Sequence, residues 1–115
     1  MNRVVGFEIS SREPELTTKF FEDVFGWDIG EPNYEYWPVV TGKGANVVSG
    51  GIAKGPEDHP HGTRIRIEVD SIDETLAIAK VKGAEVVREK MEFDTFYLAY
   101  LKEPTGIDIG LIEQK

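Results

Sequence analysis

The clearest pattern of hydrophobic and polar residues lies between Thr63 and Gly83. Ile65, Ile67 and Val69 alternate with charged residues, as in a β-strand with one buried face and one polar face. A helical period of apolar residues follows at once, at Ile72, Leu76, Ile78 and Ala79. This stretch therefore predicts a strand that packs beneath its own helix.

Signals for both ends of this helix are present. Ser71 stands three residues before Glu74, the spacing at which a hydroxyl and a carboxylate satisfy each other's backbone N–H groups. At the other end Lys80 and Lys82 complement the helix dipole, and Gly83 readily adopts a left-handed conformation. We therefore expect a helix near residues 71–82.

The same order of elements occurs earlier in the chain. Apolar residues alternate between Arg3 and Ile9, which predicts a first strand. Pro14 suits the first turn of a helix near residues 13–25, with Ser11 or Glu13 as its cap. The helix ends at a glycine, and its apolar stripe comprises Leu16, Phe20 and Val24, with Phe21 and Phe25 beside them.

Short strand-like runs follow each helix. They cover residues 27–29, 36–41 and 46–53 in the first half, and residues 84–90, 96–102 and 107–113 in the second. Both halves thus predict β-α-β-β-β order, which indicates duplication of one unit. We expect a single α+β domain over residues 1–115, with repeats 1–54 and 62–115 joined by a Gly- and Pro-rich linker at 55–61.

Net charge and cysteine content limit the classes of binding partner that the chain can have. The net charge of −8 argues against nucleic acid and anionic membranes, because both require positive surface. The chain has no cysteine, which excludes disulfides and thiolate metal sites and suits the cytosol. No apolar run approaches the length of a membrane span, so a cytoplasmic location is expected.

Three segments carry a resemblance to a known family: FFEDVFGW (Phe20 to Trp27), IEVDSIDET (Ile67 to Thr75) and YLKEPTGIDIGLIE (Tyr100 to Glu113). Together with the tandem repeat they resemble the vicinal oxygen chelate superfamily, which includes glyoxalase I, bleomycin-binding proteins and extradiol dioxygenases. Glu103 replaces the aspartate of the family's Asp-Pro-x-Gly turn. The resemblance implies curved mixed sheets around a concave cleft.

In metal-bearing members the ligands come from the first and last strands of each half. Those positions fall here on Gly6, Arg64 and Gly110, with the fourth near residues 49–51. Glycine has no donor atom, and a guanidinium is a permanent cation that repels a metal ion. We therefore expect neither the family's metal centre nor another cofactor.

The resemblance also implies which side chains line the cleft. Arg64 or Arg66 would hold a carboxylate, phosphate or carbonyl oxygen, and Glu8 or Asp108 would accept from a ligand amine or act as a base. Trp37, with its neighbours in residues 34–37, would form an aromatic wall or stack on a cation, or else belong to a core or interface. The alternative for the charged residues is a cross-strand network that only keeps the sheet face polar.

His59 and His61 are the only histidines, two positions apart in the linker. Such a pair chelates a metal where a third ligand, here Glu57 or Asp58, is near. A loop without a buried supporting shell favours an exposed linker instead.

Three functions are compatible with these features. The first is a protein that binds a small organic molecule without a metal, as bleomycin-binding members suggest for cationic or aromatic ligands. The second is a lyase or isomerase that acts on a small oxygenated metabolite, and the third is a dimeric accessory module without a ligand. A homodimer is expected because one small core has a surplus of aromatic residues, namely Trp27, Tyr36, Trp37, Phe93 and Phe96.

Overall fold

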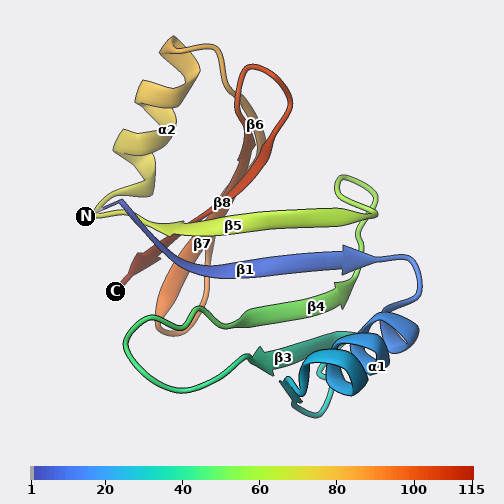
Figure 1. Ribbon diagram of the computed structural model, residues 1–115. Helices are drawn as coiled ribbons and strands as arrows, with labels where there is room; N and C mark the ends of the chain where they lie inside the picture. Colours follow the sequence, from blue (N-terminus) through green and yellow to red (C-terminus); the bar gives the residue numbers. More distant parts are fainter. Residues whose placement is uncertain (1) are drawn as a thin grey trace. The chain divides into compact units, whose positions relative to one another are not determined.

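The computed structural model describes residues 2–115, which form two compact units (Figure 1). The N-terminal unit comprises Gly6–Thr63. The C-terminal unit comprises residues 2–5 together with Arg64–Lys115. No helix in the described part of the chain is long and apolar enough to cross a bilayer.

The N-terminal unit contains one helix and four strands, in the order β1 (Arg3–Ser11, within this unit from Gly6), α1 (Pro14–Phe25), β2 (Asp28–Ile29), β3 (Tyr36–Val40) and β4 (Gly50–Lys54). Its strands lie in the order β2-β3-β4-β1. β1 runs parallel to β4, and the other neighbours are antiparallel.

The C-terminal unit repeats this arrangement with β5 (Gly62–Glu68, within this unit from Arg64), α2 (Ile72–Val81), β6 (Glu85–Glu92), β7 (Phe96–Lys102) and β8 (Asp108–Gln114). Its strand order is β6-β7-β8-β5, with β5 parallel to β8 and the other pairs antiparallel. The predicted α+β class and the β-α-β-β-β order of both halves are therefore confirmed.

β4 begins at Gly50, four residues later than expected. The preceding loop makes its bonds through a side chain rather than through a strand ladder, since the Thr41 hydroxyl donates to the carbonyl of Val48 (2.7 Å). The backbone N–H of Thr41 also donates weakly to the Ser49 hydroxyl (3.4 Å). Apolar residues 47 and 48 misled the prediction because a strand and an apolar loop look alike over such a short run.

Both predicted signals of α2 are present. The Ser71 hydroxyl accepts from the backbone N–H of Glu74 (3.1 Å), which is one half of the capping box. The N–H of Ile72 donates to the carboxylate of Glu113 on β8 (2.8 Å), so the last strand also anchors the start of the helix. Gly83 follows the helix with φ +97°, the left-handed conformation expected of it.

The start of α1 combines both candidate caps. Glu13 occupies the cap position but makes no capping hydrogen bond with its side chain. The Ser11 hydroxyl instead accepts from the N–H of Glu13 (3.0 Å) and from the hydroxyl of Thr17 (2.7 Å). Pro14 lies in the first turn, and Gly26 closes the helix with φ +69°, both as predicted.

The apolar face of the C-terminal unit forms the larger core. The helix α2 contacts β6, β7 and β8, and alternate residues of β7 and β8 point toward it, as strand periodicity requires. The buried members of this core are Val69, Ile72, Leu76, Ala99, Leu101 and Leu111. The opposite face of the same strands is left for polar residues.

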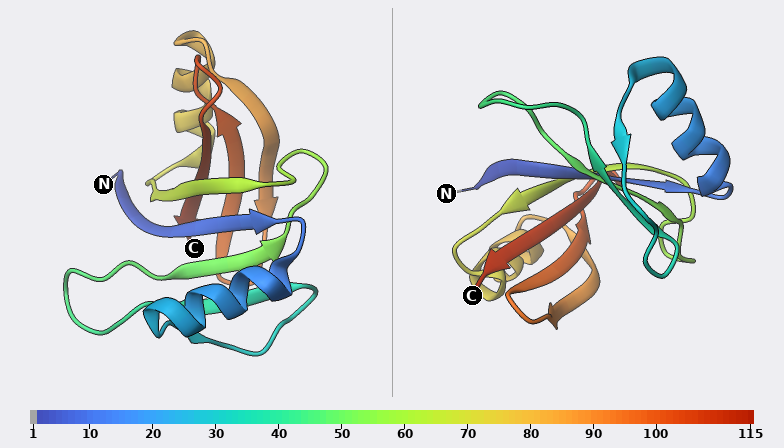
Figure 2. Two further views of the ribbon diagram at one scale, coloured as in Figure 1. Left: turned by 45° about the vertical axis from the view of Figure 1, so that its right-hand side comes forward. Right: turned by 90° about the horizontal axis from the view of Figure 1, so that it is seen from below.

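The expected stripe of α1 does not face its sheet. Leu16, Phe20 and Val24 are 65%, 54% and 56% exposed, whereas Pro14 and Thr18 are buried. The helix contacts β4 and β2 and lies along one face of the strands (Figure 2). Small contact residues allow close approach of helix and sheet, so the bulky stripe is turned outward.

Aromatic rings join this helix to its sheet at one edge. The ring of Phe21 stacks on that of Trp27 with centroids 4.5 Å apart and planes 9° apart. Phe7 of β1 lies against the same indole at 5.6 Å. Phe25 also packs within 6.2 Å of it, so Trp27 is the centre of an aromatic cluster that is only partly buried.

Candidate functional site: the polar sheet faces

One row of residues crosses the C-terminal unit on the face opposite α2. Arg66 of β5 lies beside Gly110 of β8, which in turn lies opposite Tyr100 of β7. Arg64 and Asp108 precede the first two by two positions and therefore share their face. The strand registers therefore place these charged residues on the polar face, as predicted.

Arg64 does not extend into solvent. Its guanidinium carbon lies 3.7 Å from the centroid of the Tyr100 ring, and the two residues are only 7% and 8% exposed. Such stacking of a cation on an aromatic face is stronger when water is excluded. Gly110, between the strands that carry them, has no side chain to block the approach.

Asp108 has a cation directly opposite on the next strand. Its carboxylate lies 2.8 Å from the ammonium of Lys102, with which it is paired in the β7–β8 register. The two side chains are 18% and 34% exposed. This pair matches the cross-strand interaction weighed for Asp108, although its partner is a lysine that sequence analysis did not select.

In the N-terminal unit, Glu8 lies on the face opposite α1. It is paired with Gly51 of β4, which is paired with Pro38 of β3. The ring of Tyr36 lies over Gly51, since a Cβ placed there would be 2.1 Å from the phenolic oxygen. Tyr36 therefore reaches across β4 toward the strand that carries Glu8.

Trp37 lies on the other face of this sheet. Its neighbour Tyr36 points to the Glu8 face, and strand alternation directs Trp37 the opposite way. It lines a cavity of about 220 Å³ with Thr18 and Glu22 of α1. Trp37 is thus separated from Glu8 by the thickness of the sheet, and its role in binding stays a prediction.

The residues at the family's metal positions do not fit a divalent cation. Gly6 and Gly110 have no side-chain donor atoms, and Arg64 places a fixed positive charge on the same face as Gly110. Among residues 2–115 no group of three or more histidine, aspartate and glutamate side chains is close enough to share a metal ion. The absence of the metal centre that the resemblance implies stays a prediction.

His59 corrects the expectation of an exposed linker. It is 5% exposed, whereas His61 is exposed as expected. The N–H of His59 donates to the carbonyl of Pro56 (3.1 Å), which closes a tight turn. Gly55 permits this folding, because a Cβ there would lie 2.2 Å from the carbonyl oxygen of Pro60.

Tyr100 and Lys102 are the residues of this face that sequence analysis missed. Both belong to an expected strand, and their alternation with Leu101 was visible in the sequence. Which strand lies beside β7, and in which register, was not visible there. That register brings Tyr100 next to Gly110 and Lys102 next to Asp108.

No family model and no curated protein matches this chain. Solved structures do: a glyoxalase/bleomycin resistance protein/dioxygenase superfamily member from Vibrio splendidus 12B01 is 14% identical with a TM-score of 0.68, over 100% of both chains. A methylmalonyl-CoA epimerase in complex with methylmalonyl-CoA is 15% identical with a TM-score of 0.66, over 99% of this chain and 95% of that one.

A third match is a Legionella pneumophila protein described as an NAD-dependent benzaldehyde dehydrogenase, 15% identical with a TM-score of 0.67 over 95% of this chain and 97% of that one. The three described activities differ. Likeness at this level of identity therefore confirms the glyoxalase-like fold and leaves the activity to the site.

Proposed function

We propose that this chain, which has the fold of the vicinal oxygen chelate superfamily, binds a small organic molecule on its polar sheet faces without a divalent metal. The observation that carries the proposal is the stacking of Arg64 on Tyr100 at 3.7 Å, beside Gly110. By the resemblance, Arg64 stands at a position where metal-bearing members of the superfamily have a ligand. An anionic or carbonyl oxygen of a ligand, rather than a metal ion, is the natural partner of such a site.

Arg66 is the better anchor of the two arginines. It is half-buried and stands next to Gly110, whose missing side chain leaves room above the strand. The planar guanidinium fork binds a carboxylate through two parallel hydrogen bonds. Arg64 and Tyr100 would lie beside that contact and support it, because the guanidinium of Arg64 is stacked on the Tyr100 ring.

Glu8 and Tyr36 form a separate candidate group within the N-terminal unit. Glu8 would accept a hydrogen bond from a ligand amine or hydroxyl, and Tyr36 would border it across Gly51. Asp108 forms an ion pair with Lys102, so it would affect the electrostatic potential of the site in the C-terminal unit rather than contact the ligand directly. A ligand of the C-terminal unit would therefore carry a carboxylate or carbonyl group, and a ligand of the N-terminal unit would carry a hydrogen-bond donor.

An isomerase or lyase is the second candidate. A carboxylate and a phenol on the same sheet face, Glu8 of β1 and Tyr36 of β3 with β4 between them, are groups that relay a proton. One structural neighbour is an epimerase. Turnover of a bound carbonyl compound, lost in Glu8→Gln, would favour this candidate over simple binding.

We also propose that the chain forms a homodimer through the outer face of α1. Leu16, Phe20 and Val24 expose apolar surface there, and Phe25 is 60% exposed beside them. A two-fold axis would place the same face of both copies together and bury each of these side chains. A dimer without ligand binding would instead support the accessory-module hypothesis.

The binding proposal is tested by thermal-shift screening of small carboxylates and amino-carbonyl compounds, with and without EDTA. We expect stabilisation that EDTA does not remove. Arg66→Gln should weaken the best compound's binding by about 1.5–3 kcal/mol, the range for a charged hydrogen bond. Arg12→Gln, an exposed arginine beyond the polar face, is the matched control and should bind normally. Binding that requires a metal would overturn the proposal.

A further inference from the structure

A cavity of about 420 Å³ lies in the C-terminal unit between α2 and the apolar face of its sheet. Its walls are mainly aliphatic, and they include Ile67, Ile78, Leu101, Ile109 and Leu111. These strand residues alternate with those of the polar row, so the cavity opens on the opposite side of the sheet from Arg66 and Tyr100. It is therefore separate from the site proposed above.

The cavity arises from the side chains that α2 turns inward. Ile72 and Leu76 fill the space beneath the first half of the helix and are buried. The small side chains of Thr75 and Ala79 line the cavity on the helix side. The helix also packs mainly along β6, which leaves the side toward β5 open.

We propose that this cavity is a second binding site, which takes an uncharged apolar molecule such as a short aliphatic chain. Its volume lies within the range of about 300–1,000 Å³ typical of small-molecule sites. Water is a poor occupant of the aliphatic part of the cavity, because a buried water molecule needs two to four polar partners and the polar lining residues are few. An apolar occupant would complete the contacts that α2 leaves unmade.

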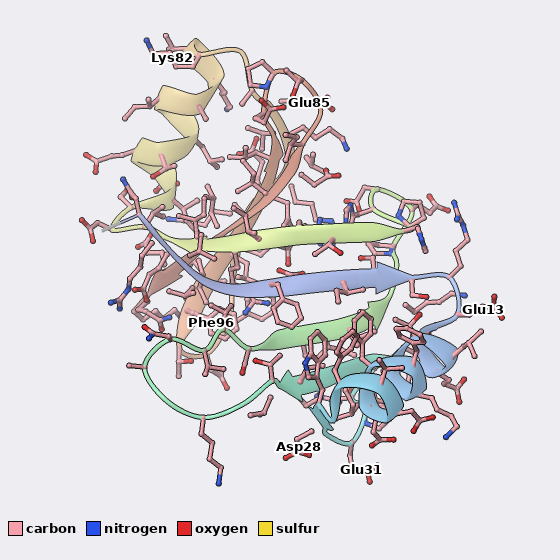
Figure 3. All side chains as sticks on the ribbon, in the orientation of Figure 1. Glu13, Asp28, Glu31, Lys82, Glu85 and Phe96 are labelled. Atoms are coloured by element: carbon pink, nitrogen blue, oxygen red, sulfur yellow. The ribbon has the colours of Figure 1, made fainter. Side chains whose placement is uncertain are left out.

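The charges at the rim of the cavity indicate that the ligand's polar group is uncharged. Lys82 and Glu103 bring opposite charges to it, and the carbonyl end of α2 adds a partial negative charge. Lys82, at the end of the helix, and Glu85, at the start of β6, are labelled in Figure 3. Since the rim has no net positive charge, it would not favour a carboxylate over an alcohol.

The carboxylate of Glu103 is already hydrogen-bonded within the chain. It accepts from the N–H groups of Thr105 (2.6 Å) and Ile107 (3.0 Å) and from the Thr105 hydroxyl. These bonds hold the turn before β8 in place, so the carboxylate forms a fixed border of the cavity. A ligand would contact it from the side rather than displace it.

The test is a titration of the full chain with 1-alkanols of increasing length. Binding is measured by calorimetry or by ligand-observed NMR. Each added methylene should strengthen binding about fourfold until the chain fills the cavity. Carboxylates of equal length should bind no more tightly. Affinity that does not depend on chain length, or a preference for the carboxylates, would overturn the proposal.

A matched pair of helix variants locates the site. Ala79→Leu places a side chain in the cavity, whereas Ala77→Leu makes the same change on the exposed side of α2. We expect Ala79→Leu to abolish alkanol binding and raise the melting temperature, and Ala77→Leu to change neither. If Ala79→Leu instead alters only the oligomeric state measured by sedimentation, the cavity belongs to an interface between copies and the proposal is wrong.

Discussion

Arg64 and Tyr100 lie on strands that are separated by β8, yet the guanidinium carbon of one is 3.7 Å from the ring centroid of the other. The contact crosses the strand at Gly110, the residue in register with Tyr100. Gly110 has no side chain, so it adds no bulk to the face on which the guanidinium and the ring meet.

Removing the ring should destabilise the C-terminal unit. Tyr100→Leu loses a desolvated cation–π contact worth about 2 kcal/mol, so the free energy of unfolding should fall by at least that amount in urea denaturation. Tyr100→Phe keeps an aromatic face and should lose less. Equal stability of the leucine and phenylalanine variants would show that the stacking contributes little.

Filling the gap at Gly110 should have a related effect. Gly110→Val adds a branched side chain in the row between Arg66 and Tyr100, and overpacking of this kind costs about 1–3 kcal/mol. Gly42→Val is a matched control, because a Cβ there meets only Val47 at 3.7 Å or more. Chemical denaturation of both variants makes the comparison. A larger loss in the control would contradict the proposed geometry.

The cap of α2 gives a third prediction. Ser71→Ala removes the acceptor of the Glu74 N–H and should lower the free energy of unfolding by about 1 kcal/mol. Ser71→Asp restores an acceptor and should recover most of the loss. Both values come from equilibrium unfolding. Failure of the aspartate to recover stability would indicate that the hydroxyl acts in some other way.

Acid should weaken the turn before β8. Hydrogen bonds from Thr105 and Ile107 lower the pKa of Glu103 below its ordinary value of 4.5. A group with a lowered pKa in the folded state stabilises the protein above its unfolded pKa and loses that effect as the pH falls through the folded value. Glu103→Gln should therefore be less stable than the parent at pH 7, and the gap should close below about pH 4. A gap that does not depend on pH would exclude the carboxylate charge as its source.

Local signals predicted the elements, while contacts between elements could not be predicted. The Ser71 cap and Gly83 marked the ends of α2 correctly because helix ends depend on neighbouring residues. The stripe of α1 through Phe20 was correct in period and wrong in direction, since packing of Thr18 against the sheet decides which side is buried. The contact of Arg64 with Tyr100 depends on the registers of β5 and β7 with β8. Local sequence patterns do not predict these registers.

The most direct test of the metal-free account is elemental analysis by mass spectrometry of protein grown in metal-supplemented medium and purified without chelators. The account predicts far less than one equivalent of zinc, nickel, iron, manganese or cobalt per chain, because Gly6, Arg64 and Gly110 supply no ligand. A full equivalent of one of these metals, placed beside these residues by anomalous scattering, would contradict it.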